Sequence, residues 1–184
     1  MPIENIPSVI ENGILSYYNS TSYKHASIAL KGVQERREKV KIPNGNWLHS
    51  YANLYFTYHN PMMYRRKDEA ESLCILAVKP TVLNIEGCVL SDQNASRDLV
   101  RFYTPEDGLN NIDFDLVFAE YWNIGDYYEQ CRRKAIKCAE VLVPNAIPYD
   151  YIVAACVLNK ESEQKMQTYG FHKKISINTK PFFR

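Results

Sequence analysis

The chain has 184 residues, with 22 basic and 21 acidic side chains and a formal net charge of +1. This length suits one domain with a sizeable buried core. The near-neutral charge excludes a strongly basic nucleic-acid binder but allows a local basic patch. No window approaches the ~18 apolar residues of a membrane span, and the first residues lack the pattern of a signal peptide, so we expect a cytoplasmic protein that does not enter membranes.

Helical and strand patterns alternate irregularly along the chain. The expected helices are 5–13, a weak helix over 27–41, a turn after Pro61, the basic segment 127–139, and 161–169. The expected strands are 48–58, 73–78, 88–90, 141–143, 152–158 and 174–177, with loops at 17–24 and 105–115 and a mixed region at 114–128. No G-x-G-x-x-G segment follows a strand, which disfavours a Rossmann fold. The pattern therefore predicts an α+β domain.

Cysteine and histidine spacing gives no sign of a metal site. The five cysteines are odd in number and include no C-x-x-C pair, which argues against a disulfide framework and against a zinc knuckle. The four histidines show no H-x-x-x-H spacing. We expect no metal cofactor.

Basic residues gather in three clusters, at 31–41, 65–67 and 132–137. A single cluster of this kind is most often a solvated face. Three clusters interleaved with fourteen tyrosines are more typical of a groove that binds phosphates and stacks bases. This interpretation assigns nucleic-acid contacts to Lys39, Lys41, Arg65, Arg66, Arg132 and Arg133.

Glu140 stands where the basic helix gives way to the apolar run 141–143, which Pro144 ends. A short apolar strand is buried on at least one side. A carboxylate entering it is either paired or takes part in chemistry. An ion pair with Arg133 or Lys137 is the structural alternative, and this segment alone leaves both interpretations open.

Other segments carry groups suited to ligand binding. Arg36 and Arg37 offer planar donors that can grip a diphosphate, although basic residues also suit a solvated helix end. The aromatic strand at 48–58 has side chains that can enclose a flat cationic ring. The polar turn 91–96 and the loop 17–24 are consistent with plain surface, and the loop also with a flap over a ligand.

In this order, the segments resemble the DarT family, the toxins of bacterial toxin–antitoxin pairs that ADP-ribosylate DNA bases. The resemblance covers nearly the whole chain. It is carried by N-I-P-S-V-I-E-N-G-I at 5–14, by I-x5-Q-x2-R at 28–37, by Y-x3-Y-F-x3-N-P-M at 51–62, by S-D-x-N-A at 91–95, and by R-x5-A-E-x-L-V-P-x3-P at 133–148. It implies one ADP-ribosyltransferase-like α+β domain over residues 1–184, with a compact mixed or antiparallel β core surrounded by helices.

The resemblance also implies roles for individual residues. Glu140 matches the family's catalytic glutamate, and Arg37 matches its arginine before the Tyr-Phe strand. Glu140 would hydrogen-bond the ribose of NAD+, and Arg37 would contact the diphosphate or the incoming base. The residues expected around NAD+ are Asn5, Tyr55, Phe56, Pro61 and Met62.

The implied reaction transfers ADP-ribose from NAD+, as co-substrate, to a base of single-stranded DNA, which we expect to be thymidine, and releases nicotinamide. The implied partner is a macrodomain-type antitoxin, with phage defence as the biological setting. RNA or protein as acceptor, and simple NAD+ hydrolysis, stay open at this point. So does a non-enzymatic module that binds nucleic acid or an antitoxin.

One departure from the family concerns the beginning of the chain. Family members usually begin with a strand that carries a His-x-Thr element, whose histidine helps to hold the NAD+ ribose. The present sequence begins Met-Pro-Ile-Glu-Asn, without this strand. We expect either a start further upstream or a different way of holding NAD+.

Overall fold

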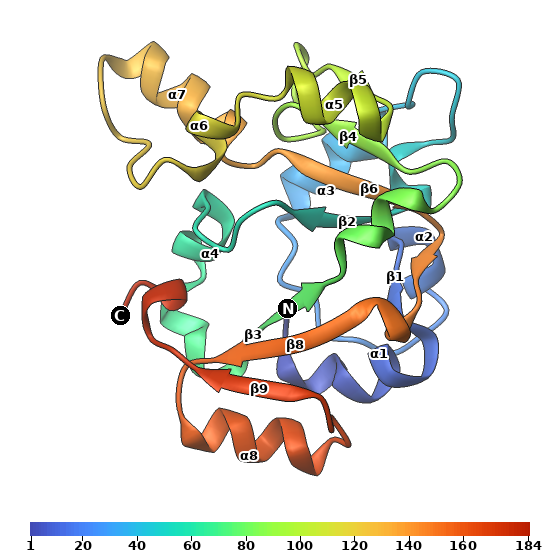
Figure 1. Cartoon of the computed structure of the whole chain (residues 1–184), viewed down its shortest axis with the longest axis vertical. Helices are drawn as coiled ribbons and strands as arrows, with labels where there is room; N and C mark the ends of the chain where they lie inside the picture. Colours follow the sequence, from blue (N-terminus) through green and yellow to red (C-terminus); the bar gives the residue numbers. More distant parts are fainter.

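The computed structural model describes residues 1–184 and contains two main β-sheets that face each other (Figure 1). The four-stranded sheet has the order β2 (Tyr51–Tyr55), β6 (Glu140–Pro144), β4 (Val89–Ser91) and β5 (Phe102–Tyr103), and is antiparallel throughout. The three-stranded sheet has the order β3 (Cys74–Val78), β8 (Ile152–Val157) and β9 (Lys174–Ile177), with β8 and β9 parallel. Two short strands, β1 (Ile14–Leu15) and β7 (Ala146–Ile147), pair separately. This confirms the expected α+β class with a mixed β core.

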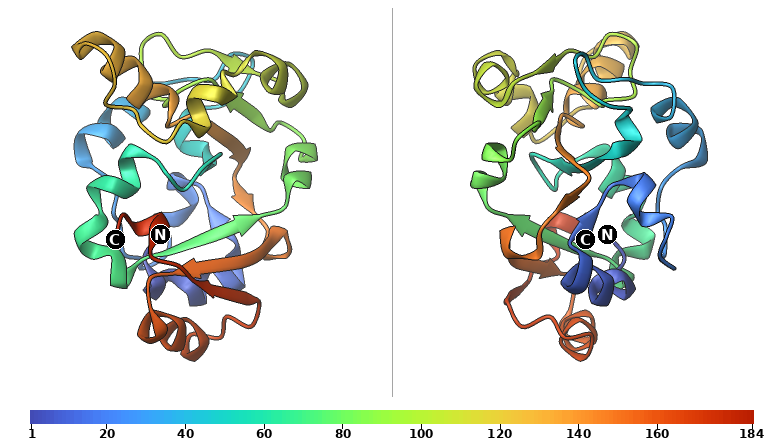
Figure 2. Two further views of the ribbon diagram at one scale, coloured as in Figure 1. Left: turned by 60° about the vertical axis from the view of Figure 1, so that its left-hand side comes forward. Right: turned by 90° about the vertical axis from the view of Figure 1, so that its right-hand side faces the viewer.

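Eight helices surround the two sheets (Figures 1 and 2). They are α1 (Ile6–Asn12), α2 (Tyr17–Ser20), α3 (Lys31–Arg37), α4 (Pro61–Arg65), α5 (Pro105–Asn111), α6 (Phe114–Phe118), α7 (Tyr127–Ile136) and α8 (Lys160–Thr168). Short 3-10 turns lie at Ile3–Asn5, Leu48–Ser50, Lys67–Ser72, Pro80–Asn84, Tyr149–Tyr151 and Lys180–Phe182. Figure 2 shows α8 outside the three-stranded sheet, with α7 at the opposite end of the molecule. None of the helices combines the length and the apolar character needed to cross a membrane.

Strand β6 is buried on both faces, which explains its apolar sequence. Val141 and Val143 pack into a core with Leu90 and with Val117 of α6. Leu142 points the other way, into a second core. Fully burying each such side chain contributes about 1.5–3 kcal/mol to the free energy of folding. Strand β6 therefore stabilises the cores on both faces of the sheet.

The structure confirms several expected elements and corrects others. Helix α1 has Pro7 in its first turn and ends before Gly13 at φ 77°, as its sequence predicts. The helix expected over 27–41 is limited to Lys31–Arg37, and the strand expected over 48–58 is limited to Tyr51–Tyr55. The loop expected at 105–115 is wrong, because α5 occupies its first part. The side chain of Thr104 caps this helix and Pro105 opens it.

Candidate active site

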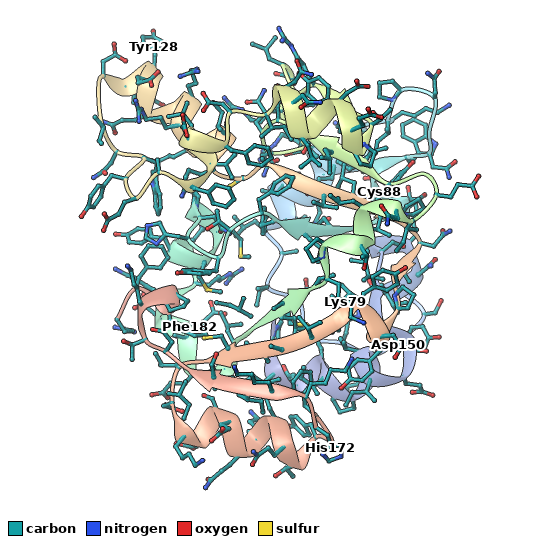
Figure 3. All side chains as sticks on the ribbon, in the orientation of Figure 1. Lys79, Cys88, Tyr128, Asp150, His172 and Phe182 are labelled. Carbon is teal, nitrogen blue, oxygen red and sulfur yellow. The ribbon has the colours of Figure 1, made fainter.

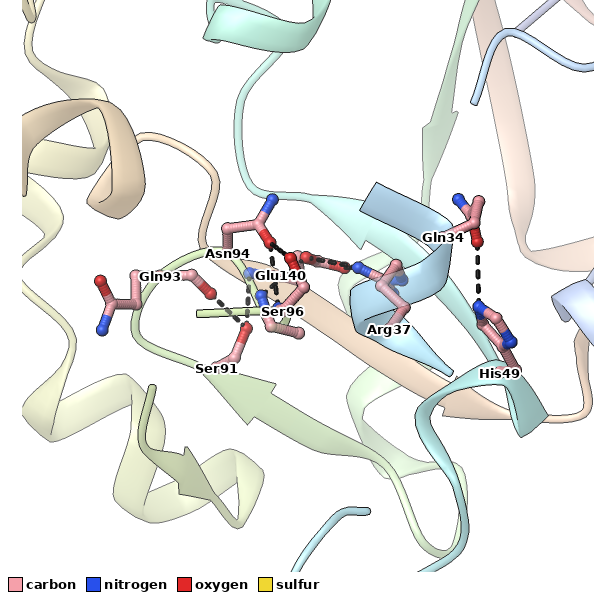
Figure 4. Close-up of polar contacts among 9 residues, drawn as sticks. Gln34, Arg37, His49, Ser91, Gln93, Asn94, Ser96 and Glu140 are labelled. Atoms are coloured by element: carbon pink, nitrogen blue, oxygen red, sulfur yellow. Dashed lines mark hydrogen bonds and ion pairs between the residues drawn. The ribbon is translucent and has the colours of Figure 1, made fainter. Parts of the chain in front are cut away.

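The last residue of α3 and the first residue of β6 form a buried ion pair (Figure 4). Arg37 Nη1 donates to both carboxylate oxygens of Glu140, at 2.9 Å to Oε1 and 3.0 Å to Oε2. The Glu140 side chain is fully buried, and that of Arg37 is 7% exposed. Charge-assisted bonds in a site without water are strong. The pair therefore fixes the ends of two elements that lie 103 positions apart.

The polar turn after β4 forms the other wall of this site. The backbone N–H of Ala95 donates to Glu140 Oε1 at 3.0 Å. Ser91 lies opposite Glu140 across the strand pair, and its Oγ accepts from the Glu140 backbone N–H at 3.2 Å. The same hydroxyl donates to the carbonyl of Gln93 at 2.8 Å. The turn thus holds both the backbone and the carboxylate of Glu140 in place.

The titratable groups closest to Glu140 have pKa values that are shifted by burial and by the Glu140 carboxylate. Burial alone would lower the pKa of Arg37, but the charge and hydrogen bonds of Glu140 raise it above its ordinary value. Tyr55 lies opposite Glu140 in β2, and burial together with this carboxylate raises the pKa of its hydroxyl. The same two causes raise the pKa of Cys138 to about 12. Arg37 is therefore charged at neutral pH, while the tyrosine and the cysteine are not.

A second group of side chains, His49, Gln34 and Tyr17, helps to fix the position of α3. His49 Nε2 and Gln34 Oε1 are 3.0 Å apart, and the histidine is buried (Figure 4). Tyr17 stacks on the His49 ring, with centroids 4.2 Å apart. Burial and the nearby Arg37 charge lower the pKa of His49. This neutral histidine links the start of α2, the turn before β2 and the helix that carries Arg37.

A cavity of about 810 Å³ lies between the two sheets, and Val141, the residue after Glu140, is part of its lining. Strands β2 and β3 contribute to its walls, together with side chains of α4 and α6. Tyr55, Phe56, Asn60 and Met62 are among the residues that line it. Pro61 is the first residue of α4 and is absent from the lining. The volume falls within the range of small-molecule sites, about 300–1,000 Å³.

Asn5 lies elsewhere and has a structural contact. Its Nδ2 donates to the carbonyl of Ala26 at 2.8 Å, and its Oδ1 accepts from the Ala26 N–H at 2.9 Å. These reciprocal bonds fasten the segment between α2 and α3 to the start of α1. Ile28 of this segment lines the cavity, so Asn5 acts on the cavity wall from a distance.

Both ion-pair partners considered for Glu140 are wrong. Arg133 Nε donates to Glu129 at 2.8 Å, one helical turn away. Lys137 is 1% exposed, and its Nζ donates to the carbonyl of Val117 at 2.9 Å and to that of Ala119 at 2.6 Å. The basic cluster 132–137 therefore does not act as one unit, because Arg133 lies on the surface of α7 whereas Lys137 is buried and bonds the end of α6.

The six predicted nucleic-acid residues lie on three separate elements. Lys39 and Lys41 are exposed after α3, and Arg65 is exposed on α4. Arg66 has structural partners, donating to Glu69 at 2.7 Å and to the Ile28 carbonyl at 2.5 Å. Of the six, Arg132 lines a polar groove on the surface of the molecule, whose volume is about 910 Å³.

Sequence reasoning missed two contributors to the site. The Ala95 N–H bonds a residue 45 positions away, and His49 contacts Gln34, 15 positions away. The spacing of Glu129 and Arg133 by four positions does signal an ion pair within one helix. This spacing indicates that Arg133 is paired with Glu129 and is not available to Glu140. No group of three or more His, Cys, Asp and Glu side chains is placed to hold a metal ion.

Comparison with known proteins identifies relatives of the whole chain. Thermosipho africanus has a fusion of a DNA ADP-ribosyl transferase and a DNA ADP-ribosyl glycohydrolase that is 29% identical over 191 residues, covering 98% of this chain and 47% of the fusion. The DNA ADP-ribosyl transferase of Thermus sp. strain 2.9 is 28% identical over 169 residues, covering 86% of this chain and 78% of the relative. The chain thus spans about half the length of the fusion protein.

Solved structures show the same fold. Thermosipho africanus DarTG in complex with ADP-ribose superposes with a TM-score of 0.86 at 26% identity, covering 99% of this chain and 49% of that one. Thermus sp. 2.9 DarT in complex with ADP-ribosylated ssDNA gives a TM-score of 0.85 at 23% identity, covering 98% and 92%. A family model described as "ssDNA thymidine ADP-ribosyltransferase, DarT" matches residues 1–183. Because the match extends over nearly the whole sequence, the chain belongs to the DarT family.

Proposed function

We propose that this chain is an NAD+-dependent ADP-ribosyltransferase that modifies thymidine in single-stranded DNA and releases nicotinamide. Membership of the family supports the reaction, and solved relatives are named as complexes with NAD+ and with ADP-ribosylated ssDNA. One observation of the structure carries the assignment of residues. Glu140 and Arg37, which match the family's two key positions, meet in one buried site. Neither lines the cavity, but Val141, the chain neighbour of Glu140, and Tyr55, its partner across the strand pair, do.

Glu140 is the catalytic carboxylate in this proposal. Its Oε1 accepts two hydrogen bonds, from Arg37 and Ala95, whereas Oε2 accepts only one, from Arg37. A carboxylate oxygen has two lone pairs, so Oε2 is the oxygen free to accept a hydroxyl of the NAD+ ribose. Because Glu140 is fully buried, substrate entry must displace part of the contact with Arg37.

The bond between ribose and nicotinamide breaks in the chemical step, and nicotinamide leaves with the electron pair. Positive charge develops on the sugar, and a carboxylate fixed beside it stabilises that charge. A nitrogen of the base then forms the new bond to the same ribose carbon and gives up its proton, for which Glu140 is the nearest acceptor. Arg37, released from one oxygen, binds the diphosphate or the incoming base.

The cavity between the sheets is the proposed site for NAD+. Its aromatic and apolar lining, with Tyr55 and Phe56 at the end nearest Glu140, suits a nicotinamide ring. Met62 packs along the same wall. Asn5 contributes by holding the segment that ends at Ile28, and Pro61 by opening α4. We propose that residues 1–184 form one catalytic domain.

A non-enzymatic binding module is the second candidate. The observation that favours it is the complete burial of Glu140 in its ion pair, because a carboxylate without access to a ligand has only a structural role. An acceptor other than DNA is a variation of the first candidate. We also propose a cytoplasmic location and an antitoxin that removes the modification, since one relative is fused to a DNA ADP-ribosyl glycohydrolase.

Labelled NAD+ incubated with separate pools of single-stranded DNA, duplex DNA and RNA tests the proposal. We expect label on single-stranded DNA, and a loss of about 10²–10⁴-fold in rate for Glu140→Gln. Glu161→Gln is the matched control, since Glu161 is exposed on α8, and it should label like the wild type. Label on RNA alone would change the acceptor. No label on any pool would favour the binding module, whereas full activity of Glu140→Gln would refute Glu140 as the catalytic carboxylate.

A further inference from the structure

The polar groove is lined by different residues from the cavity, and it too comes close to the Glu140 site along the chain. Its walls come from the segment after β4, from the loop between α5 and α6, and from α7. Ser96, in the lining, follows the residue whose N–H holds Glu140, and Arg36, also in the lining, precedes Arg37. The groove thus borders chain neighbours of both Arg37 and the residue that holds Glu140. A second substrate bound in the groove would lie close to the buried pair.

Four arginines line this groove, at positions 36, 97, 101 and 132. Three of them make no ion pair, and Arg132 has only long contacts of 3.3 and 3.4 Å to Glu129. Planar guanidinium groups that are free of carboxylates are suited to phosphate.

The remaining polar lining suits the edges of bases. Asp92, Asp98 and Asp113 lie in the groove together with Gln93 and Asn111. Asp92 accepts the Arg101 N–H at 3.0 Å, so part of its capacity is used within the loop. Carboxylates and amides accept from and donate to base edges, while a uniformly basic wall would bind only the backbone.

An exposed tyrosine stands at the rim of the groove. Tyr128 is 82% exposed and belongs to the lining, and Figure 3 shows it at the outer tip of α7. Tyr127 beside it is 75% exposed. A large aromatic ring left in solvent next to arginines is typical of a surface on which single-stranded bases stack.

We propose that the acceptor strand lies in this groove, with its phosphates on Arg97, Arg101 and Arg132 and with a base stacked on Tyr128. The proposal rests on the proposed function, since it places that reaction's acceptor. It replaces most of the set chosen from charge alone, of which only Arg132 is retained. The occupant is a single strand, because a paired duplex offers no free base face to the tyrosine.

Binding of a fluorescent single-stranded oligonucleotide, followed by anisotropy over a range of salt concentrations, tests the groove. Tyr128→Ala should weaken binding roughly 5- to 150-fold. The double variant Arg97→Ala/Arg101→Ala should reduce the slope of log affinity against log salt by about 0.7 for each phosphate that the variant no longer binds. The matched controls are Tyr121→Ala, an exposed tyrosine outside the lining, and Lys165→Ala/Lys174→Ala, which removes two charges near the three-stranded sheet. Both controls should bind like the wild type.

The labelling assay separates this proposal from the proposed function. If the wild type modifies single-stranded DNA and the groove variants bind and modify it equally well, the groove assignment is wrong and the function stands. If the groove variants lose binding but the wild type transfers no label, the groove stands and the chemistry is wrong. Wild-type protein that binds no single strand at low salt would overturn the groove assignment by itself. Thermal melting of each variant confirms that a loss of binding is not a loss of folding.

Discussion

Replacement of Arg37 by methionine tests the energetics of the site most directly. Glu140 accepts three hydrogen bonds, and two of them come from Arg37. The variant keeps a long apolar side chain but leaves a fully buried carboxylate with the Ala95 N–H as its single donor. Removing one partner of a buried ion pair typically lowers the free energy of unfolding by about 3–5 kcal/mol. We expect a loss in this range for Arg37→Met.

The double variant Arg37→Met/Glu140→Gln supplies the control. It removes both charges, and the glutamine oxygen can still accept the Ala95 N–H. Replacing both partners of a buried pair is often neutral or stabilising, so the double variant should be more stable than Arg37→Met alone. The coupling between the two positions then appears as a strongly non-additive double-mutant cycle.

Urea unfolding at neutral pH, followed by circular dichroism, measures the wild type, Arg37→Met, Glu140→Gln and the double variant. The slope with denaturant should stay constant, so that midpoints report stability. The reasoning would be refuted if Arg37→Met lost less than about 1 kcal/mol, a value typical of exposed pairs. It would equally be refuted if the double variant lost the sum of the two single effects. Either result would mean that water reaches the Glu140 carboxylate in solution.

Three other predictions concern the surroundings of the site. Lys137→Met leaves the carbonyls of Val117 and Ala119 without their donor. We expect the free energy of unfolding to fall by about 1–3 kcal/mol and hydrogen exchange to become faster in residues 117–126. Unchanged exchange would contradict a role of the lysine in holding the end of α6. Gly13→Ala should destabilise the protein by at least about 1 kcal/mol, because φ is +77° and a Cβ would lie 2.2 Å from the Ile147 oxygen; Gly32→Ala, where nothing lies within 4 Å of a Cβ, is the control in thermal melts and should not lose stability. The pKa of His49 is lowered by burial and by Arg37, so the folded protein binds this proton less readily than the unfolded chain. The free energy of unfolding should therefore be highest above about pH 6.5 and should fall as the pH drops below it. Urea midpoints that fall equally in His49→Gln would show that another group is responsible.

The sequence predicts strands well where an apolar run is bounded by a breaking residue. Strands β3 and β8 fall within their expected ranges, because their apolar runs supply residues to the core. Strand β9 also falls within its expected range, although it is mostly exposed. Helix α5 was missed because its evidence is a cap, Thr104 before Pro105, rather than an apolar period. A 3.6-residue pattern is weak in a helix of seven residues.

The site could be predicted residue by residue but not as an arrangement. Glu140 is unusual in its own segment, and Arg37 is recognisable from a resemblance. Their pairing depends on β6 entering the sheet beside β2 and β4, which no local pattern specifies. For the same reason, the charge cluster 132–137 looked continuous, although Lys137 turns inward and Arg133 bonds along its helix. Spacing along the chain does not report which side of a helix end faces the core.

The position of β6 has a consequence for the order in which the molecule is built. This strand lies between β2 and β4 in the sheet but is synthesised after both of them. The 103 positions between Arg37 and Glu140 take roughly 5–20 seconds to synthesise at about 5–20 residues per second. During this time β2 and β4 have no strand between them. Each can pair with β6 only when that strand has been made, and this pairing requires contacts between residues far apart in the sequence. The growing chain therefore cannot form the buried pair of Arg37 and Glu140 until most of it has been made.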